Sequence, residues 1–196
     1  TFEEYTINTC IRKLHFLAQV RHESGELKFQ EELASGEAYE NRTDLGNTKK
    51  GDGKRFKGRG LIQITGRKNY TKYGIDKNMN FINEPNNKKL ASLPFSVNSA
   101  GWYWSECLTT NLNIFADSDD IIYITYRING GFNGYLEDRK PKLIKMIKNI
   151  NCQNSKFINF ESYFIKNSEC WKLHDAVFKY AVLNTIESKE CYQRYL

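Results

Sequence analysis

The stretch VRHESGELKFQEELASG, Val20–Gly36, carries glutamates on both sides of a glycine. Its first part continues a helical pattern in which Phe16, Val20 and Glu23 share one stripe. That pattern places Glu23 in the last helical turn, beside apolar side chains. The negative end of the helix dipole and the apolar neighbours both favour the neutral carboxyl group, which suits a general acid.

Glu23 also has a simpler interpretation as a surface charge. A glutamate at a helix end is by itself most often a solvated surface charge, and Arg21 and His22 are close enough in sequence to pair with it. The hypothesis of a general acid therefore depends on whether the chain supplies a second carboxylate.

Glu32 is the candidate partner, provided that the chain turns before it. On one continuous helix, nine residues correspond to a rise of about 13.5 Å and a rotation of about 900°, which puts Glu23 and Glu32 on opposite faces. Ser24-Gly25 supplies a break, because glycine is favoured just past a helix end. Two carboxyl groups about 6.5–9.5 Å apart would suit inverting glycoside hydrolysis. The alternatives for the second carboxylate are Glu26, Glu31, Glu37 and Glu40.

The segment LIQIT, Leu61–Thr65, alternates in polarity and predicts a strand. Ile62 and Ile64 would anchor it in the core, while Gln63 and Thr65 would point together to the other face. An amide beside a hydroxyl suits the binding of a sugar hydroxyl or of an attacking water. An ordinary half-exposed strand is the competing interpretation.

Helical periodicity elsewhere predicts a mainly α protein in which this strand is the small β element. Helices are expected over residues 6–23, 66–74, 94–108, 118–131 and 134–149, and again within about 160–190. Gly74 is expected to stop the second of them, and Ser118 to cap the fourth. Pro141 is expected to kink or restart the fifth.

Length and composition indicate one globular domain. The chain has 196 residues, of which 40% are hydrophobic, so a packed core is expected. The sequence offers no apolar run of the roughly 18 residues that a membrane span needs. The net charge of +6 and the pI of about 9.0 favour an anionic partner such as a charged cell-wall polymer. The lysines are scattered, which argues against a nucleic-acid site.

Cysteine and histidine spacing predicts neither a metal site nor a cofactor. The five cysteines are Cys10, Cys107, Cys152, Cys170 and Cys191. They form no CxxC pair, so zinc-finger spacing is absent. Three lie beyond residue 150, where a disulfide would tie down the tail, and buried free thiols are the alternative. The three histidines are His15, His22 and His174, and only His22 lies near plausible partner ligands, so a metal site built on histidines is not expected.

Three blocks of the sequence resemble the glycoside hydrolase family 19 domain of chitinases, phage endolysins and bacterial lysozymes. They are HFLAQVRHESGELKF (His15–Phe29), LGNTKKGDGKRFKGRGLIQITGRKNY (Leu45–Tyr70) and INGGFNG (Ile128–Gly134). The resemblance covers about residues 5–149 and implies a lysozyme-like, two-lobed fold with the sugar cleft between the lobes. It places the catalytic domain at residues 1–150, with residues 151–196 as a helical C-terminal extension packed on it.

The resemblance also implies roles for individual residues. Glu23 matches the general acid, Glu32 the general base of the compact bacterial and phage members, and Thr65 the residue that helps hold the attacking water. The residues expected to bind substrate are Gln63, Asn69, Tyr70, Asn129, Arg139 and His22.

The function implied is that of a lysozyme, a muramidase that cleaves the β-1,4 bonds of peptidoglycan by inversion. It would act as an endolysin or as an antibacterial toxin domain. The alternatives are a chitinase and a catalytically silent sugar-binding module. We expect a monomer that binds no nucleic acid, with an immunity or inhibitor protein as partner if it is a toxin. It would act on the cell wall, in the periplasm or outside the cell. The chain shows no signal peptide, so delivery by another route or domain is expected.

Overall fold

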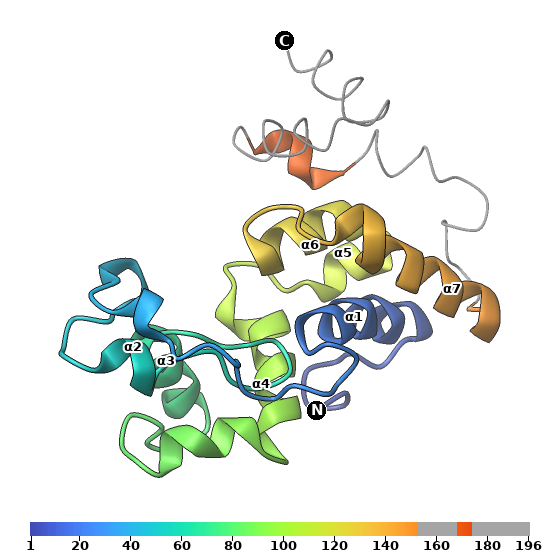
Figure 1. The fold of residues 1–196 in the computed structure, drawn as a ribbon. Helices are drawn as coiled ribbons and strands as arrows, with labels where there is room; N and C mark the ends of the chain where they lie inside the picture. Colours follow the sequence, from blue (N-terminus) through green and yellow to red (C-terminus); the bar gives the residue numbers. More distant parts are fainter. Residues whose placement is uncertain (153–167, 174–196) are drawn as a thin grey trace. The chain divides into compact units, whose positions relative to one another are not determined.

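The computed structural model describes residues 1–152 and 168–173 (Figure 1). Helices joined by irregular segments make up this part of the chain, which confirms the mainly α prediction. The helix expected within residues 160–190 lies largely outside the described residues. The helical C-terminal extension over residues 151–196 therefore stays a prediction.

The α-helices are α1 (Cys10–Glu23), α2 (Asp52–Arg55), α3 (Arg67–Asp76), α4 (Phe95–Trp102), α5 (Asn113–Asp117), α6 (Ile121–Asn129) and α7 (Lys140–Ile150). The 3-10 helices are η1 (Glu37–Tyr39), η2 (Thr43–Leu45), η3 (Asn86–Ala91) and η7 (Glu169–Lys172). The π-helical turns are η4 (Tyr103–Cys107) and η5 (Tyr135–Arg139).

The chain forms two compact units. The first consists of Thr1–Tyr5 and Val20–Thr110, and the second of Thr6–Gln19 together with the chain from Asn111 onward. The helix α1 contributes its first ten residues to the second unit and its last four, Val20–Glu23, to the first. Each unit has its own apolar core.

Aromatic side chains dominate the core of the first unit. Tyr73 of α3 stacks on Phe81 with ring centroids 5.2 Å apart, and contacts Trp102 of α4 at the same distance. All three are nearly or fully buried. Burial of large aromatic rings supplies much of the packing energy in a unit of this size.

The second unit packs aliphatic side chains around buried polar pairs. Ile121, Ile122 and Ile124 of α6 are fully buried. On α1, the His15 Nε2 atom lies 2.8 Å from an Asp119 carboxylate oxygen, with both side chains buried. Such a pair satisfies polar groups that would otherwise be costly inside a core.

A disulfide joins Cys10, at the start of α1, to Cys152, with their Cα atoms 5.9 Å apart. The sequence left open whether a cysteine beyond residue 150 forms a disulfide, and this bond decides the point for Cys152. It closes the chain over a sequence separation of 142 residues. Among the described residues, Cys107 is a free cysteine.

The strand predicted over Leu61–Thr65 is wrong. Residues Gly60–Gln63 form a turn, closed by reciprocal backbone hydrogen bonds of 3.1 and 2.8 Å between Arg59 and Ile64. Gln63 has a φ of 54°, a left-handed conformation that breaks the two-residue alternation of a strand. Only isolated β-bridges occur here.

The structure also corrects two predicted helix ends. Gly74 does not stop α3, which runs to Asp76. A Cβ atom at Gly74 would lie 2.5 Å from the Met79 carbonyl oxygen. Glycine at this position therefore lets the backbone at Met79 pass close to α3. Asp120, not Ser118, caps α6, because its side chain accepts a hydrogen bond from the Tyr123 N–H.

Three other predicted boundaries are confirmed. Gly130 ends α6 in a left-handed conformation with φ 71°. Pro141 sits in the first turn of α7, directly after η5, so it restarts the helix as expected. The helix expected over residues 94–108 forms as α4 followed by η4.

Asp52 links the loop that precedes α2 to Arg67, the first residue of α3. Its buried carboxylate accepts hydrogen bonds from the backbone N–H groups of Thr48 and Lys49 at 3.1 and 3.0 Å. It also pairs with the Arg67 guanidinium, at 2.9 Å to Nε. Burial opposes ionisation of Asp52, but Arg67 and the backbone donors outweigh it and lower its pKa.

Asp52→Asn should lower the free energy of unfolding by roughly 2–4 kcal/mol near pH 7, because it leaves the Arg67 charge without its partner. A lowered pKa in the folded state means that the stabilisation is present above the unfolded pKa of about 4 and is lost as the pH falls through the folded value. Urea denaturation at pH 7 and near pH 3 measures this. An equal gap between the two proteins at both pH values would contradict the assignment.

Candidate active site

A pocket of about 420 Å³ in the first unit gathers three of the glutamates singled out in the sequence. We call it the carboxylate pocket. It is lined by Glu23, Glu31, Glu32, Gln63, Thr65, Phe29, Leu33, Ala34 and Tyr39. The fold thus brings Glu23 and Glu32 into one cavity, although they could not meet on one helix.

The turn after α1 is what makes this meeting possible. Glu23 is the last residue of the helix, and Gly25 follows with a φ of 55°. Ser24 is fully buried, and its hydroxyl donates to the Val20 carbonyl at 2.7 Å. The helix therefore ends where the glycine predicted, and the chain returns toward the pocket.

Two neutral donors hold the Glu32 carboxylate. The Tyr39 hydroxyl donates to Oε1 at 2.9 Å, and the Gly58 N–H donates to Oε2 at 3.0 Å. The backbone adds a reciprocal bond, from the Glu32 N–H to the Gly58 carbonyl at 2.9 Å. One donor on each oxygen fixes the orientation of the carboxylate and leaves lone pairs that can accept from a water molecule.

Glu31 also lines the pocket but is engaged by cations. Its Oε1 accepts from Arg59 Nε at 3.0 Å and lies 3.5 Å from Lys57 Nζ. The Arg59 side chain is almost fully buried. A carboxylate that compensates a buried guanidinium is poorly suited to take a proton from water, since protonation would leave that charge unpaired.

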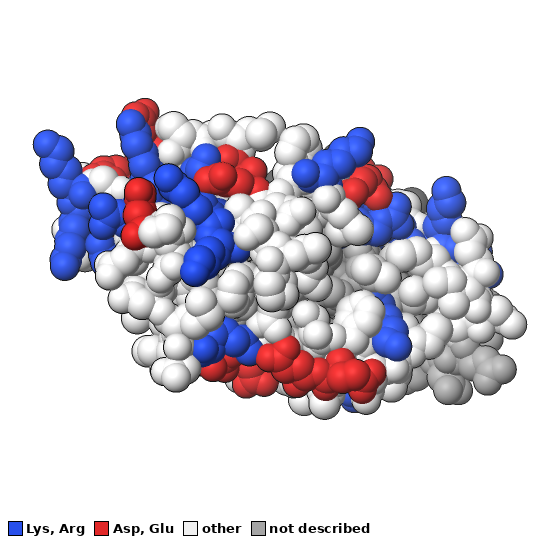
Figure 2. Space-filling view, turned by 90° about the horizontal axis from the view of Figure 1, so that it is seen from below, with Lys and Arg blue, Asp and Glu red and all other residues white. Residues whose placement is uncertain are grey.

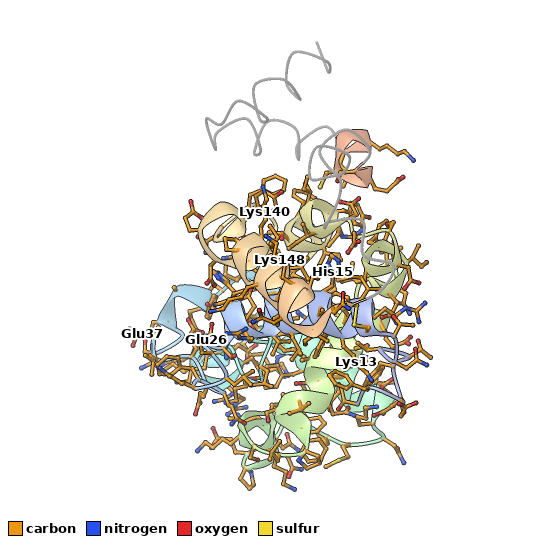
Figure 3. All side chains as sticks on the ribbon, turned by 90° about the vertical axis from the view of Figure 1, so that its right-hand side faces the viewer. Lys13, His15, Glu26, Glu37, Lys140 and Lys148 are labelled. Carbon is orange, nitrogen blue, oxygen red and sulfur yellow. A yellow bond between two sulfur atoms is a disulfide. The ribbon has the colours of Figure 1, made fainter. Side chains whose placement is uncertain are left out.

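The other three alternatives are not among the residues that line the carboxylate pocket. Glu26 pairs with Arg21, and Glu37 pairs with Lys54 at 2.8 Å. Both glutamates are exposed (Figure 3). Glu40 accepts from the Gly51 and Gly53 N–H groups at 2.7 and 2.8 Å. Of the five candidates, Glu32 is the one whose surroundings suit a base.

Gln63 and Thr65 line the pocket even though the strand that was expected to present them is absent. The Thr65 hydroxyl donates to the Gln63 carbonyl at 2.9 Å, and the Gln63 amide donates to the Gly60 carbonyl at 2.9 Å. Asn69 on α3 donates to the Thr65 carbonyl at 3.0 Å. These hydrogen bonds hold Gln63 and Thr65 in the pocket wall and join Thr65 to α3.

Tyr70 and His22 occupy different surroundings. Tyr70 is fully buried; its hydroxyl donates to the Lys57 carbonyl at 2.7 Å and accepts from Arg59 at 2.9 Å. His22 is partly exposed in the last turn of α1, next to Glu23. Substrate binding by these two residues stays a prediction.

Asn129 and Arg139 belong to the second unit. Asn129 is exposed at the end of α6, and its side-chain oxygen accepts from the Asn133 N–H at 3.3 Å. Arg139 is fully buried; it donates to the Asn133 carbonyl at 2.9 Å and to the Gln19 side chain. Their contact with substrate also stays a prediction.

The sequence interpretation missed Tyr39 and Phe29, and it gave Gly58 no contact with Glu32, although glycines at this point suggest a close approach of the backbone. Tyr39 lies seven residues beyond Glu32, in η1, where no periodic pattern marks it. A Cβ atom at Gly58 would lie 2.7 Å from Gln63 Oε1 and 3.3 Å from Glu32 Oε2. Only glycine lets both side chains approach the backbone this closely.

Tyr39→Phe should lower kcat on the glycan substrate about five- to tenfold with little change in KM, because one hydrogen bond to an ionised group is lost. Burial, and then the hydrogen bond to Glu32, raise the pKa of Tyr39, so its phenol is a proton donor at neutral pH.

Tyr73→Phe is the matched control, because that hydroxyl donates at 2.8 Å to Asn98, which is not a lining residue of the carboxylate pocket. Initial rates over a range of substrate concentrations give kcat and KM for both variants. An unchanged kcat for Tyr39→Phe would show that Tyr39 does not act on the base.

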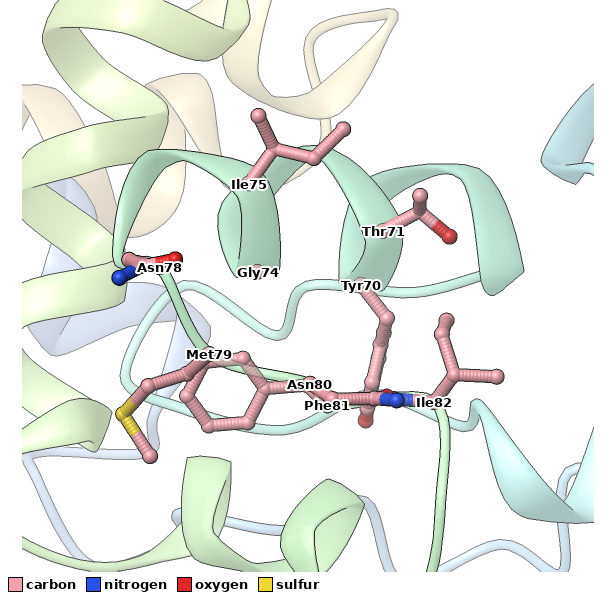
Figure 4. Close-up of a pocket in the computed structure, with 9 residues that line it drawn as sticks. All are labelled: Tyr70, Thr71, Gly74, Ile75, Asn78, Met79, Asn80, Phe81 and Ile82. Carbon is pink, nitrogen blue, oxygen red and sulfur yellow. The ribbon is translucent and has the colours of Figure 1, made fainter.

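A second and larger pocket, of about 600 Å³, lies beside α3 (Figure 4). Its lining runs along α3 and the following loop, through Tyr70, Gly74, Ile75, Met79 and Phe81. Glu23 and Glu32 are not among its lining residues. Its wall is largely apolar and offers no pair of ionisable groups, so size alone does not make it the catalytic centre.

Positive and negative side chains are interspersed on the face in Figure 2.

Within the described residues, no group of three or more His, Cys, Asp or Glu side chains is placed to hold a metal ion. No helix in that part of the chain is long and apolar enough to cross a membrane. The carboxylate pocket is therefore the arrangement with the clearest chemistry in the described structure.

No protein-family model matches the chain. It is 33% identical over 172 residues to a glycosyl hydrolase family 19 domain-containing protein from Haemophilus influenzae, covering 70% of this chain and 80% of that protein. That identity, over most of both chains, indicates common descent.

Solved structures share the fold. Chitinase C from Streptomyces griseus superposes with a TM-score of 0.61 at 22% identity, covering 79% of this chain and 68% of that one. A bacterial family 19 chitinase gives 0.61 at 19% identity, covering 79% and 84%. A class IV chitinase from Zea mays gives 0.59 at 19% identity, covering 74% and 71%.

Proposed function

Since this chain belongs to glycosyl hydrolase family 19, we propose that it is a lysozyme that hydrolyses the β-1,4 glycosidic bonds of peptidoglycan by inversion. It is a glycoside hydrolase, and its substrates are β-1,4-linked glycans of the chitin and peptidoglycan kind. The observation that carries the proposal is the joint placement of Glu23 and Glu32 in one pocket, with Glu32 held by neutral donors.

The reaction assigns a separate role to each carboxyl group. Glu23 gives its proton to the glycosidic oxygen as the bond from that oxygen to the anomeric carbon breaks. Glu32 takes a proton from a water molecule, whose oxygen bonds to the anomeric carbon from the opposite face. The products are two shorter glycans, with the anomeric centre inverted. Glu23 ends ionised and Glu32 protonated, and exchange with solvent restores both.

We propose that Thr65 and Gln63 assist the attacking water. The Thr65 hydroxyl donates its proton to the Gln63 carbonyl, so its oxygen has lone pairs directed elsewhere that can accept from water. Gln63 and Thr65 share the pocket with Glu32. We assign Thr65 to holding the attacking water and Gln63 to lining the sugar site.

Charge and loop length support peptidoglycan over chitin. The chain carries a net charge of +6, which attracts a wall containing anionic polymers, whereas chitin is neutral. Glu23 and Glu32 are only nine residues apart, the compact spacing that resembles bacterial and phage wall-degrading members. The net charge of the chain affects its attraction to the cell wall. It does not change how the glycosidic bond is cleaved.

A chitinase is the second candidate, because the solved structures with this fold include chitinases. Both polymers contain β-1,4-linked N-acetylglucosamine, so the same two glutamates would serve either. A catalytically silent sugar-binding module is disfavoured by a pocket that retains both carboxylates.

Incubation with purified peptidoglycan and, separately, with chitin hexamer distinguishes the two candidates. Mass spectrometry of the products should show muropeptides from peptidoglycan, released at least tenfold faster than chitin fragments. Chitin cleavage without wall cleavage would overturn the substrate assignment. Cleavage of neither polymer by the native chain would overturn the proposed activity.

The proposal also places the protein at the cell wall, in the periplasm or outside the cell. As an endolysin it would need only the wall polymer. As an antibacterial toxin it would need an immunity or inhibitor protein that covers the carboxylate pocket. We propose that it works as a monomer, because both carboxylates come from one unit of one chain.

A further inference from the structure

One aromatic side chain stands exposed in the wall of the carboxylate pocket. Phe29 lines the pocket together with Glu23 and Glu32, and 44% of its surface is exposed. A single exposed apolar side chain is common on protein surfaces and needs no explanation by itself. The inference therefore depends on how the chain holds this ring.

The segment before Phe29 adopts a costly backbone conformation. Glu26 and Leu27 are consecutive non-glycine residues with φ values of 64° and 67°. Each such residue typically costs about 1–3 kcal/mol and persists only where its surroundings enforce it. Strain of this kind gathers at ligand sites, where it fixes a side chain in advance of binding.

Backbone hydrogen bonds enforce the turn. The Glu26 N–H donates to the Arg21 carbonyl at 2.7 Å. The Leu27 N–H donates to the Ser24 hydroxyl at 2.9 Å, and the Phe29 N–H donates to the Ser24 carbonyl at 2.8 Å. Ser24 is fully buried at the end of α1. Phe29 is thus tied directly to the residue that follows Glu23.

The bare backbone of Gly25 gives the ring its position. A Cβ atom at Gly25 would lie 2.8 Å from Phe29 Cδ2 and 3.0 Å from Cε2. The edge of the ring therefore rests where any other residue would place a side chain. Gly25 both ends the helix and seats the aromatic ring, while the rest of that ring stays exposed.

We propose that Phe29 is a substrate-binding platform, on which one sugar ring of an N-acetylated β-1,4 glycan stacks beside the two catalytic carboxylates. A pyranose ring has a face of C–H bonds, and its contact with an aromatic face removes apolar surface of both from water. Leu33, which is 81% exposed, and Ala34 extend this apolar wall and can receive the methyl group of an acetamido substituent. The inference rests on the proposed glycosidase function.

The test measures binding without turnover. In the Glu23→Gln protein, titration calorimetry gives the Kd of the N-acetylglucosamine tetramer. Adding Phe29→Ala should raise that Kd about tenfold, which corresponds to about 1.4 kcal/mol. Phe29→Trp should keep the Kd within twofold of the parent, because it restores an aromatic face. Leu93→Ala removes an exposed apolar side chain (72% exposed) that is not a lining residue of this pocket, and should change nothing.

The outcomes separate the two proposals. A Kd for Phe29→Ala within twofold of the parent overturns the platform, and so does a tryptophan variant that binds as weakly as alanine or a parent that does not bind the tetramer. Equal thermal unfolding midpoints show that the alanine variant is folded. If the native chain cleaves glycans while Phe29→Ala binds normally, only the platform fails. If the native chain cleaves neither polymer, the proposed function fails.

Discussion

Glu23→Gln should reduce kcat/KM on peptidoglycan by roughly 10³-fold, within the range that a general acid contributes. Glutamine keeps the size of the side chain but has no proton to give to the leaving oxygen. The fold should be unaffected, because Glu23 is a partly exposed residue at the end of α1. Product release followed by mass spectrometry measures the loss, and the thermal unfolding midpoint provides the check on folding.

A change of leaving group separates acid catalysis from a general loss of the site. An N-acetylglucosamine oligomer with a dinitrophenyl leaving group departs without protonation, so the deficit of Glu23→Gln should be much smaller on it than on the polymer. Equal deficits on both substrates would contradict the role of acid and would assign Glu23 to binding instead.

Glu32→Gln should also reduce kcat/KM by about 10²–10⁴-fold, because the attacking water loses its base. Glu31→Gln is the matched control at the neighbouring position in the same pocket. It removes the partner of Arg59 and should lower stability while leaving the activity of the folded enzyme within about threefold. The reverse pattern, with Glu31→Gln inactive and Glu32→Gln active, would move the base to Glu31.

Azide provides an independent check on the base. In Glu32→Ala, azide can enter the space of the missing side chain and attack the anomeric carbon without a base. Added azide should therefore raise the rate and yield a glycosyl azide of inverted configuration. A rate that does not respond to azide, in a variant shown to be folded, would argue that Glu32 serves the structure of the pocket and not its chemistry.

The sequence predicted the part of the site that depends on local structure, namely the end of α1 and the turn after it. The end of α1 follows from helical spacing and from the glycine at position 25, both visible in the sequence. The choice of Glu32 among clustered glutamates came from the family resemblance. Its physical reason is three-dimensional, since Tyr39 and Gly58 hold Glu32 while Arg59 occupies Glu31.

The mistaken strand shows where such reasoning stops. LIQIT has the alternation of a strand, but the left-handed φ of Gln63 and the close approach at Gly58 come from tertiary packing. Gln63 and Thr65 nevertheless reach the pocket, for a reason other than alternation. Phe29 was equally invisible, because its position depends on a strained turn that no periodicity reports.

The anomeric configuration of the first product tests the central claim most directly. Nuclear magnetic resonance during the first minutes of cleavage of a β-1,4-linked N-acetylhexosamine oligomer shows which anomer the enzyme releases before mutarotation. Inversion by Glu23 and Glu32 predicts the α-anomer as the initial product. Initial release of the β-anomer would mean retention, and would contradict a mechanism in which Glu32 activates water.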